Sequence, residues 1–311
     1  MSNKFQEVII ELSYNCNLSC AMCGFGKHVN PFSKDKFMSF EKYKEILSQF
    51  GDKANSIRLN GRGESTIHPQ FIEIVNHTRQ QFPHLGINLF SNFSFRNPTI
   101  LNTLIKNQVQ LFISLDSTED GELQQLRRGA KLSYIENNLK GLESTTYRPF
   151  IIFTIQEDNL HRIYDIACFA RSYNCHIIYN TIRRDEGIEL FVEKVRLGKQ
   201  HITSQLKEAI SLYIDSELNC ICPDQLAGEY LALELNTQTH GSLQTCPALQ
   251  RELCILFDGT VTPCNMFNPY VYGNIFESSL TEIWKSEERL SFLDSHKDHP
   301  YCANCANLIS K

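Results

Sequence analysis

The sequence lacks the features of membrane-spanning, secreted and nucleic-acid-binding proteins. None of its apolar runs reaches the ~18 residues that a membrane span requires. Its first residues, MSNKFQEVIIELSYN, contain no basic region followed by a long apolar stretch, as a secretory signal would. Basic residues number 30 against 35 acidic ones, which leaves no positive excess for binding the phosphates of a nucleic acid. We therefore expect a cytoplasmic protein that binds neither membranes nor nucleic acids.

Disulfide bonds are not expected either, although cysteine is abundant. The 311 residues include 12 cysteines, and in the reducing cytosol metal binding is the better explanation for them. Seven of these cysteines form two groups with the spacing of metal ligands. The first group is Cys16, Cys20 and Cys23, and the second is Cys246, Cys264, Cys302 and Cys305.

The apolar pattern of the first part of the chain predicts alternating strands and helices. Short runs rich in β-branched residues recur with amphipathic stretches between them, as in β/α units around a parallel sheet. The expected strands are 8–12, 56–60, 86–90, 111–115, 150–155 and 175–179, and the expected helices are 39–49, 68–82, 133–142 and 160–172. Six such units predict an α/β fold, a partial (β/α)6 barrel of the TIM type.

The rest of the chain shows two other patterns. The strand signal fades after Asp185, which leaves an amphipathic helix near 204–218 and a cysteine-rich turn. Asp258-Gly259 then lies between two apolar runs and predicts a hairpin. We therefore expect a barrel in 1–184, a bridging segment in 185–245 and a small C-terminal domain in 246–311.

The first cysteine group, Cys16-x3-Cys20-x2-Cys23, follows directly on the first expected strand. Three thiolates on one short loop can hold three irons of a [4Fe–4S] cluster and leave the fourth iron open. An open position is typical of a catalytic metal site, whereas a structural site is closed. The triplet alone also allows a structural zinc site with a fourth ligand elsewhere, such as His28.

Short polar motifs follow the later strands in a fixed order. They are Asn60-Gly61-Arg62-Gly63-Glu64, Ser91-Asn92, Ser114-Leu115-Asp116 and Leu126-Arg127-Arg128-Gly129. Together with the cysteine triplet, they resemble the motifs of the radical S-adenosylmethionine (SAM) superfamily. The resemblance implies that SAM binds the open iron and is cleaved reductively to a 5′-deoxyadenosyl radical, which abstracts hydrogen. The cofactor-binding residues that it implies are Gly61, Gly63, Glu64, Ser91, Asn92, Ser114, Asp116 and Arg128.

The second cysteine group supplies four thiolates, enough for a zinc ion or a second cluster. The sequence around it, CPALQRELCILFDGTVTPC and then YCANC, resembles the C-terminal extension called SPASM, which carries auxiliary clusters. Because the chain ends six residues after Cys305, it resembles the shortened version called a twitch domain. The resemblance implies one auxiliary [4Fe–4S] cluster, and the cysteine spacing is similar to that of aminocyclitol-oxidising members of the superfamily.

The remaining cysteines differ in their surroundings. Cys168, Cys175 and Cys254 fall within apolar elements and are expected to be small buried residues. Cys220 and Cys222 lie in the polar bridging segment, where an exposed thiol could return a hydrogen atom to a substrate radical, as radical epimerases of the superfamily require. They are our candidate catalytic residues, and a structural or accidental pair is the alternative.

The resemblance implies a radical SAM oxidoreductase. In the first hypothesis, the auxiliary cluster accepts an electron and a small polar natural-product intermediate, such as a sugar, an aminocyclitol or a nucleoside, is oxidised. The first strand begins near Val8, which leaves no room for an N-terminal peptide-binding domain and favours a small molecule over a peptide. The alternatives are a peptide-modifying maturase, an epimerase that uses Cys220 or Cys222, and a non-catalytic zinc-binding protein.

Two further expectations concern partners. The resemblance implies a flavodoxin- or ferredoxin-type electron donor for the SAM-binding cluster. Side chains inside the barrel could contact the substrate, and the candidates are Arg62, Tyr179, Asn180 and Arg183.

Overall fold

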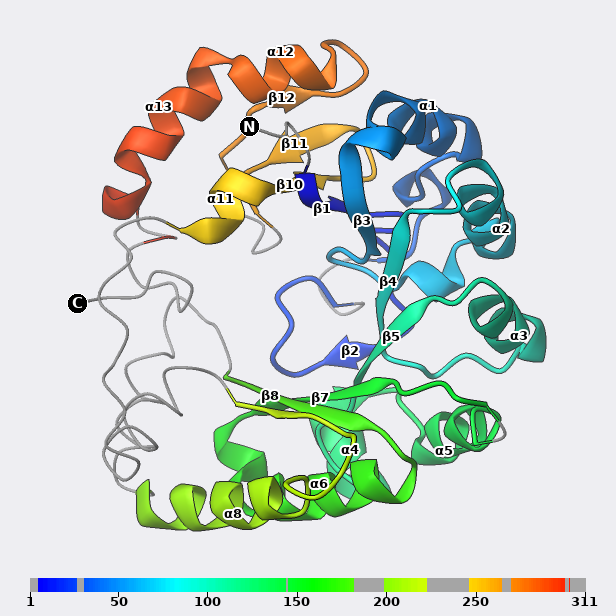
Figure 1. The fold of residues 1–311 in the computed structure, drawn as a ribbon, viewed down its shortest axis with the longest axis vertical. Helices are drawn as coiled ribbons and strands as arrows, with labels where there is room; N and C mark the ends of the chain where they lie inside the picture. Colours follow the sequence, from blue (N-terminus) through cyan, green and yellow to red (C-terminus); the bar gives the residue numbers. More distant parts are fainter. Residues whose placement is uncertain are drawn as a thin grey trace.

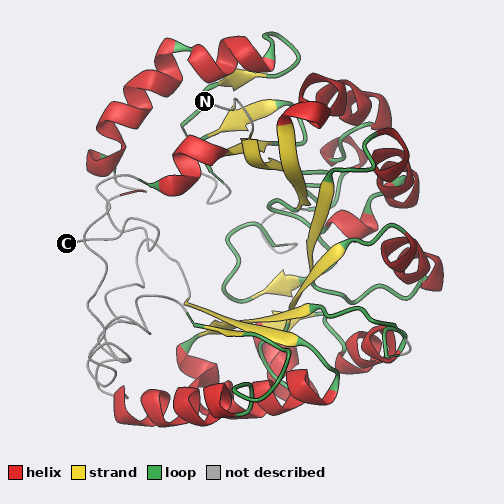
Figure 2. Cartoon of the chain, viewed as in Figure 1, coloured by secondary structure: helices red, strands yellow, loops and turns green. Residues whose placement is uncertain are grey.

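A single curved sheet organises the chain. The structure is a computed structural model that describes residues 5–26, 31–143, 145–181, 199–222, 246–264, 270–299 and 302. The sheet is mostly parallel, and its strands are hydrogen-bonded in the order β12-β11-β10-β1-β3-β4-β5-β7-β8-β9. It curves strongly, and the helices lie along its outer side (Figures 1 and 2).

Six parallel strands form the barrel part of the sheet. They are β1 (Phe5–Ile10), β3 (Ala54–Leu59), β4 (Gly86–Ser91), β5 (Gln110–Ser114), β7 (Phe150–Ile155) and β8 (His176–Thr181). Neighbouring strands run parallel throughout. Each overlaps one of the six strands expected from the apolar pattern, so the predicted partial barrel is confirmed.

Helices follow most of these strands on the outer side. They are α1 (Phe40–Phe50), α2 (Phe71–Gln81), α3 (Pro98–Lys106), α4 (Asp120–Leu126), α5 (Leu132–Lys140) and α6 (Ile163–Ser172), with 3-10 turns η1 (Lys34–Lys36), η2 (Gly51–Lys53), η3 (Ser65–Ile67) and η4 (Glu157–Arg162). The apolar pattern predicts four of them and misses α3 and α4. The N-terminus of α3 carries clear signals, because the Asn97 side chain accepts a hydrogen bond from Thr99 N and Pro98 opens the first turn.

Alternate side chains of each strand face opposite sides of the sheet. In β4, Ile87 and Leu89 are buried in the core that the helices share, whereas Asn88 and Phe90 are half-buried on the inner side. The barrel core therefore lies between the sheet and the helices. The inner side carries polar and aromatic side chains, together with a small apolar cluster of Ile9, Cys254 and Leu256.

Aromatic rings form a stacked row across this inner side. The ring centroids of Phe90 and Phe112 are 4.3 Å apart, those of Phe112 and Phe150 are 5.0 Å apart, and those of Phe150 and His176 are 4.4 Å apart. The strand register aligns these residues, because each is paired with the next. The row joins four neighbouring strands by cross-strand ring contacts.

The C-terminal part adds a hairpin to the barrel sheet. Strand β10 (Glu252–Ile255) pairs in parallel with β1, and β11 (Thr260–Thr262) returns antiparallel to it. In the turn, Gly259 has φ of +90°, a backbone conformation that favours glycine. The hairpin predicted at Asp258-Gly259 is confirmed. The other elements here are β12 (Gly273–Asn274), α11 (Pro247–Arg251), α12 (Leu280–Lys285), α13 (Glu287–Ser295) and η5 (His296–Asp298).

Two described elements belong to the expected bridging segment. Helix α8 (Lys199–Ser211) packs beside α6, and β9 (Cys220–Ile221) pairs in parallel with β8. Residues 182–198 and 223–245 lie outside the described part of the chain. The division into 1–184, 185–245 and 246–311 therefore stays a prediction.

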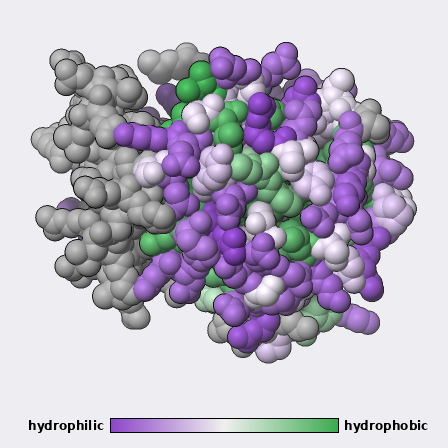
Figure 3. Space-filling model, turned by 90° about the horizontal axis from the view of Figure 1, so that it is seen from below, coloured by the Kyte–Doolittle hydropathy of each residue, from purple (hydrophilic) through white to green (hydrophobic). Residues whose placement is uncertain are grey.

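The described surface is largely polar. Hydrophilic side chains predominate on the face drawn in Figure 3, with apolar side chains between them. Large exposed apolar residues such as Phe32 and Ile214 come from separate segments, which is normal for a protein surface. In the described ranges, no helix is both long and apolar enough to pass through a membrane.

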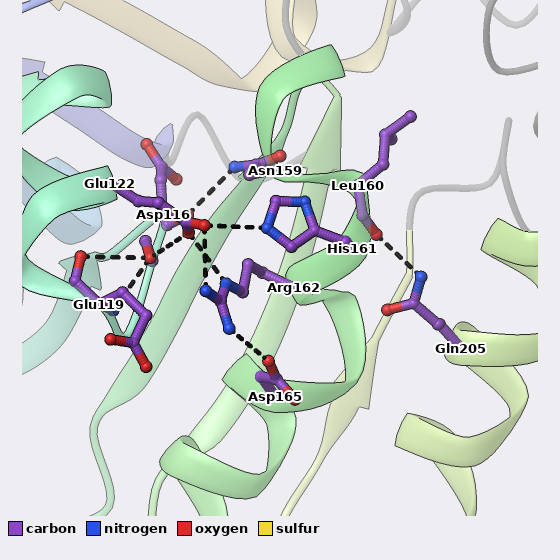
Figure 4. A network of polar contacts seen from close by, with 10 residues as sticks. Asp116, Glu119, Glu122, Asn159, Leu160, His161, Arg162, Asp165 and Gln205 are labelled. Carbon is purple, nitrogen blue, oxygen red and sulfur yellow. Dashed lines mark hydrogen bonds and ion pairs between the residues drawn. The ribbon is translucent and has the colours of Figure 1, made fainter.

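Ion pairs join α4 to η4 and α6 behind the site (Figure 4). The Glu122 carboxylate accepts hydrogen bonds from Arg162 Nε at 2.9 Å and from Ser117 Oγ at 2.8 Å, and His161 Nε2 lies 2.9 Å from it. Arg162 also donates to Asp165 at 2.9 Å. Hydrogen bonding by Arg162 is the main reason why the pKa of Glu122 falls to about 2.

We expect Glu122→Gln to lower the melting temperature at neutral pH by a few degrees. Because the folded-state pKa lies below the ordinary value of 4.5, the carboxylate stabilises the fold above that value and loses this effect as the pH falls toward about 2. Thermal unfolding at a series of pH values should show the difference from wild type shrinking below about pH 4.5. Glu119→Gln is the control, since Glu119 is exposed immediately before α4 and forms no ion pair with a described residue. A pH-independent difference for Glu122→Gln would contradict the ion-pair explanation.

Candidate functional site

The loop after β1 runs along the inner side of the sheet and carries the first cysteine group (Figure 1). It contains β2 (Ser19–Cys20), which pairs antiparallel with β6 (Arg127–Arg128). Ser19 lies opposite Arg128, and Cys20 lies opposite Arg127. The cysteine loop is thus fastened to the segment that follows the fourth barrel strand.

The three thiols have the environment of cluster ligands. The backbone N–H groups two residues after Cys16 and Cys23 each lie 3.4 Å from the thiol sulfur. Burial, together with the nearby Glu64 carboxylate, raises the pKa of Cys16 to about 12, and burial also raises the pKa of Cys20. Thiolates here therefore need a neighbouring cation, which the irons of a cluster supply, and N–H donors to sulfur are typical of cluster sites. The residue types suit a [4Fe–4S] cluster, but in the described part of the chain no three such side chains converge as a metal-binding group, so the assignment of these thiols as ligands stays a prediction.

Glu64 joins the loops that follow β1, β3 and β4. It is 4% exposed, and its backbone N donates to Asn15 O at 2.8 Å. Its Oε1 accepts from Ser91 Oγ at 2.8 Å and from Thr66 Oγ1 at 2.7 Å, and its Oε2 accepts from Asn92 N at 2.8 Å. The structure therefore brings together three of the predicted cofactor-binding residues. With one donor, Oε2 keeps room to accept from an ammonium group.

Asn17 extends this network to the first cysteine. Asn92 Nδ2 donates to Asn17 Oδ1 at 2.8 Å, and Asn17 Oδ1 lies 4.0 Å from Cys16 Sγ. Asn17 is a site residue that the sequence motifs do not single out. The only signal for it is its position inside the cysteine triplet.

The two glycines before Glu64 are needed by the cysteine loop itself. A Cβ atom on Gly63 would overlap the main-chain oxygen atoms of Ser13 and Asn15, and one on Gly61 would overlap the Glu11 side chain. Both glycines thus allow the β3 loop to pack tightly on the start of the cysteine loop. Their predicted contact with the cofactor stays a prediction.

Asp116 forms a buried ion pair with Arg127. It is fully buried, and its carboxylate accepts from Arg127 Nε at 2.7 Å and from Thr154 N at 2.8 Å. Each carboxylate oxygen of Asp116 thus has one donor, and its predicted contact with the cofactor stays a prediction. Ser114 is half-buried at the end of β5, and Arg128 is exposed.

Arg62 has a different role from the one expected of it. Its guanidinium forms a two-point salt bridge with the fully buried Glu11, with distances of 2.9 and 2.7 Å. The guanidinium carbon lies 4.1 Å from the ring centroid of Tyr14. Phe257, from the C-terminal hairpin, stacks on Tyr14 at 5.8 Å, and its N–H lies 3.4 Å from Glu11. Arg62 therefore connects the barrel to the C-terminal hairpin instead of facing a substrate.

The structure does not bring Cys220 and Cys222 to the inner side of the barrel. Cys220 pairs with Ile177, which faces the helices, and both thiols lie beside the fully buried Tyr179. The Tyr179 hydroxyl donates to Ile163 O of α6 at 2.7 Å, which fixes this side as the outer one. The expectation that these thiols reach a substrate radical, and that Tyr179 lines the barrel, is therefore corrected by the strand register.

The other single cysteines differ in their exposure to solvent. Cys175 and Cys254 are fully buried, as expected, whereas Cys168 is exposed on α6. Asn180 is exposed, and Arg183 and His28 lie outside the described residues.

The second cysteine group is partly described. Cys246 caps α11 and Cys264 follows β11, and these two and Cys302 are half-buried. Burial raises the pKa of Tyr272, and the neighbouring thiols of Cys264 and Cys302 act in the same direction, so both sulfurs lie near its ring. Cys305 lies outside the described residues. The described thiols fit the ligand set of an auxiliary cluster.

We expect Gly63→Ala to lower the iron and sulfide content of anaerobically reconstituted protein several-fold. The added Cβ would push the main chain at Asn15 away and displace the loop that carries Cys16. Gly121→Ala is the control, because its Cβ would meet nothing within 4 Å. Full iron content in Gly63→Ala would show that the close packing of the two loops is not required for the cluster.

Comparisons with known proteins agree with this geometry. A family model described as the radical SAM superfamily matches residues 10–170, and one described as an iron-sulfur cluster-binding domain, SPASM, matches residues 246–306. The tungsten-containing aldehyde ferredoxin oxidoreductase cofactor-modifying protein of Pyrococcus furiosus is 23% identical over 96% of this chain and 86% of its own length. The mycofactocin maturase MftC of Mycobacterium ulcerans is 21% identical over 96% of this chain and 80% of its own.

Solved structures show the same fold. AnSMEcpe with bound AdoMet has a TM-score of 0.71 at 17% identity, covering 97% of this chain and 87% of that one. Streptococcus suis SuiB bound to S-adenosylmethionine has a TM-score of 0.71 at 17% identity, covering 98% and 72%. BtrN, a 2-deoxy-scyllo-inosamine dehydrogenase, in complex with AdoMet and 2-DOIA, has a TM-score of 0.56 at 17% identity, covering 98% and 94%.

The radical SAM model alone spans more than half of the chain. Its cofactors are SAM and a [4Fe–4S] cluster, and the SPASM match adds an auxiliary iron–sulfur cluster. The motifs, the fold and the family match lead to one conclusion: the chain belongs to the radical SAM superfamily and carries a SPASM domain at its C-terminal end.

Proposed function

We propose that the protein is a radical SAM oxidoreductase that removes two hydrogens from a small polar molecule such as a sugar, an aminocyclitol or a nucleoside. When bound, SAM and its cluster supply a radical that takes one hydrogen atom from a C–H bond, and the auxiliary cluster supplies an acceptor for one electron. The second hydrogen leaves the substrate as a proton. A flavodoxin- or ferredoxin-type protein would provide the electron that reduces the first cluster.

The ligand assignments are part of this proposal. Cys16, Cys20 and Cys23 would hold the SAM-binding cluster, and Glu64 and Arg128 would bind the ammonium and carboxylate groups of SAM. The auxiliary cluster would be held by Cys246, Cys264, Cys302 and Cys305. The family matches at 10–170 and 246–306 support a barrel in 1–184 and an auxiliary domain in 246–311.

The observation that carries the proposal is the attachment of both thiol groups to adjacent strands. The first group follows β1, and the hairpin that leads to Cys264 begins with β10, the parallel neighbour of β1. At the ends of these strands, the backbone N–H of Phe257 donates to the Glu11 carboxylate, with 3.4 Å between the nitrogen and the oxygen. Because β11 runs antiparallel, Cys264 lies level with the start of β10, whereas the first group follows the end of β1. The two groups are thus attached to one edge of the sheet at opposite strand ends, and the SPASM match supports an auxiliary electron acceptor there.

Polar atoms on the inner side of the sheet support a polar substrate. Arg58 forms an ion pair with Glu7, and Asn88 Nδ2 donates to the same carboxylate at 2.7 Å. In the described part of the chain, Arg58 Nε and Asn60 Oδ1 are buried without a hydrogen-bond partner. Unsatisfied buried polar atoms cost free energy, and hydroxyl or amino groups of a substrate would satisfy them.

A peptide substrate is the second candidate. One relative that covers 96% of this chain is named a mycofactocin maturase, and SuiB is solved with a precursor peptide. The amide and guanidinium groups on the inner side could also bind a peptide backbone. Epimerisation is not proposed, because the thiols that would donate hydrogen lie on the helix side of the sheet.

We expect the oxidised product to be lighter than its substrate by two hydrogens. Anaerobically reconstituted protein would be incubated with SAM, dithionite and a panel of aminocyclitols, amino sugars and nucleosides, and a second panel of peptides, followed by mass spectrometry. Cys264→Ala should still cleave SAM but lose most of the oxidised product, because its electron acceptor is disrupted. Cys168→Ala is the matched control, an exposed cysteine outside both groups.

Three results would contradict the proposal. Unchanged product mass with solvent deuterium incorporated would indicate epimerisation, and reaction with peptides alone would favour the second candidate. A colourless protein that contains zinc and no iron would exclude radical chemistry altogether.

A further inference from the structure

Arg127 lies against the cysteine loop, although the family resemblance points to its neighbour Arg128. Cys20 and Arg127 are directly opposite in the β2–β6 pair, and Ala21 N donates to Leu126 O at 2.8 Å. Opposite residues of an antiparallel pair project to the same side. The Arg127 side chain is only 12% exposed, whereas Arg128 is exposed. The buried guanidinium is therefore the one beside a cluster thiol.

Asp116 fixes this guanidinium by a single nitrogen. Arg127 Nε donates to Asp116 Oδ2 at 2.7 Å, and Asp116 is itself held by Thr154 N and by Asn159 Nδ2, which donates to its main-chain oxygen at 3.2 Å. Asp116 and Asn159 are both visible in Figure 4. Among the described residues, no hydrogen-bond partner is found for the two terminal nitrogens of Arg127. They remain available to donate to sulfur.

The positive charge of Arg127 acts on the thiol of Cys20. Burial raises the pKa of Cys20, Arg127 is the largest influence that lowers it, and the Asp116 carboxylate acts against Arg127 with a smaller effect. Asp116 accepts a hydrogen bond from Arg127 Nε at 2.7 Å, which favours the charged guanidinium. The guanidinium thus stays charged at any pH at which the protein is folded.

We propose that Arg127 is a positioning residue whose buried positive charge stabilises the reduced state of the SAM-binding cluster and so raises its reduction potential. A cluster gains one negative charge when it takes up the electron from its donor, and a fixed cation beside it favours that state. Net charge and hydrogen bonds to sulfur are the means by which a protein sets such a potential. The proposal rests on the assignment of Cys16, Cys20 and Cys23 as ligands and does not depend on the substrate.

The test is a redox titration of the loaded protein without SAM, followed by electron paramagnetic resonance. The signal of the SAM-binding cluster is identified beforehand as the one that changes when SAM is added. Arg127→Met would leave Asp116 buried and unpaired, so the main variant is D116N/R127M, which removes both charges. We expect its ratio of reduced to oxidised cluster, at a fixed potential, to fall about tenfold, which is about 59 mV for one electron.

Two variants separate charge from shape and burial. Arg127→Lys keeps the positive charge and should stay within about threefold of the wild-type ratio. Arg128→Met removes the same charge from the next residue, and because water screens that exposed site, its ratio should also change by less than about threefold. All values are taken from the signal of intact cluster, so a lower loading does not alter them.

Four outcomes would overturn the proposal. The first is a wild-type ratio of reduced to oxidised cluster in D116N/R127M. The second and third are a fall in this ratio in Arg127→Lys or in Arg128→Met that equals the fall in D116N/R127M. The fourth is an unchanged ratio with weakened SAM binding, which would make Arg127 a SAM ligand. If the wild-type protein itself held no iron after reconstitution, the ligand assignment would fail, and this inference with it. Normal iron content with an unshifted potential would overturn only the role of Arg127.

Discussion

The buried carboxylate of Glu64 is the contact on which the geometry of the site depends. Its backbone holds Asn15, just before the first cysteine, and its two oxygens hold Ser91 and Asn92 at the end of β4. A buried carboxylate is costly unless donors surround it, and these donors come from segments that meet only when the loops are correctly placed. One side chain thus couples the cysteine loop to two barrel strands.

A second buried carboxylate has the same effect on the C-terminal hairpin. Glu11 is fully buried, so it needs both the two-point contact with Arg62 and the nearby N–H of Phe257. Tyr14 packs on both the guanidinium and the Phe257 ring, and the guanidinium carbon lies 6.0 Å from that ring. Because Glu11 and Tyr14 lead directly into the cysteine loop, the auxiliary domain is attached at the base of that loop. This position explains how a hairpin more than two hundred residues away in sequence becomes part of one site.

The local parts of this arrangement could be predicted from the sequence. Strand alternation depends on nearest neighbours, so the six barrel strands and the turn at Gly259 follow from the apolar pattern. The facing of Cys220 could not be predicted, because it depends on the register between β9 and β8, and a shift of one residue would turn the thiol to the other side. The pairing of Asp116 with Arg127 could not be predicted from the sequence for a related reason. The motif points to Arg128, and only the β2–β6 pairing and the contact with Asp116 show that Arg127 is the buried one.

The inner side of the barrel contains charged groups mainly as opposite pairs. Glu7 with Arg58, Glu11 with Arg62 and Asp116 with Arg127 each place a carboxylate beside a guanidinium, and in two of them the carboxylate is fully buried. Paired charges of this kind balance before any cofactor is present. The thiolates of a bound cluster would add negative charge beside one of these pairs, that of Asp116 with Arg127, because Cys20 lies opposite Arg127. Both members of this ion pair act on the Cys20 thiol in opposite directions, and Arg127, which lies directly opposite Cys20, is the stronger of the two.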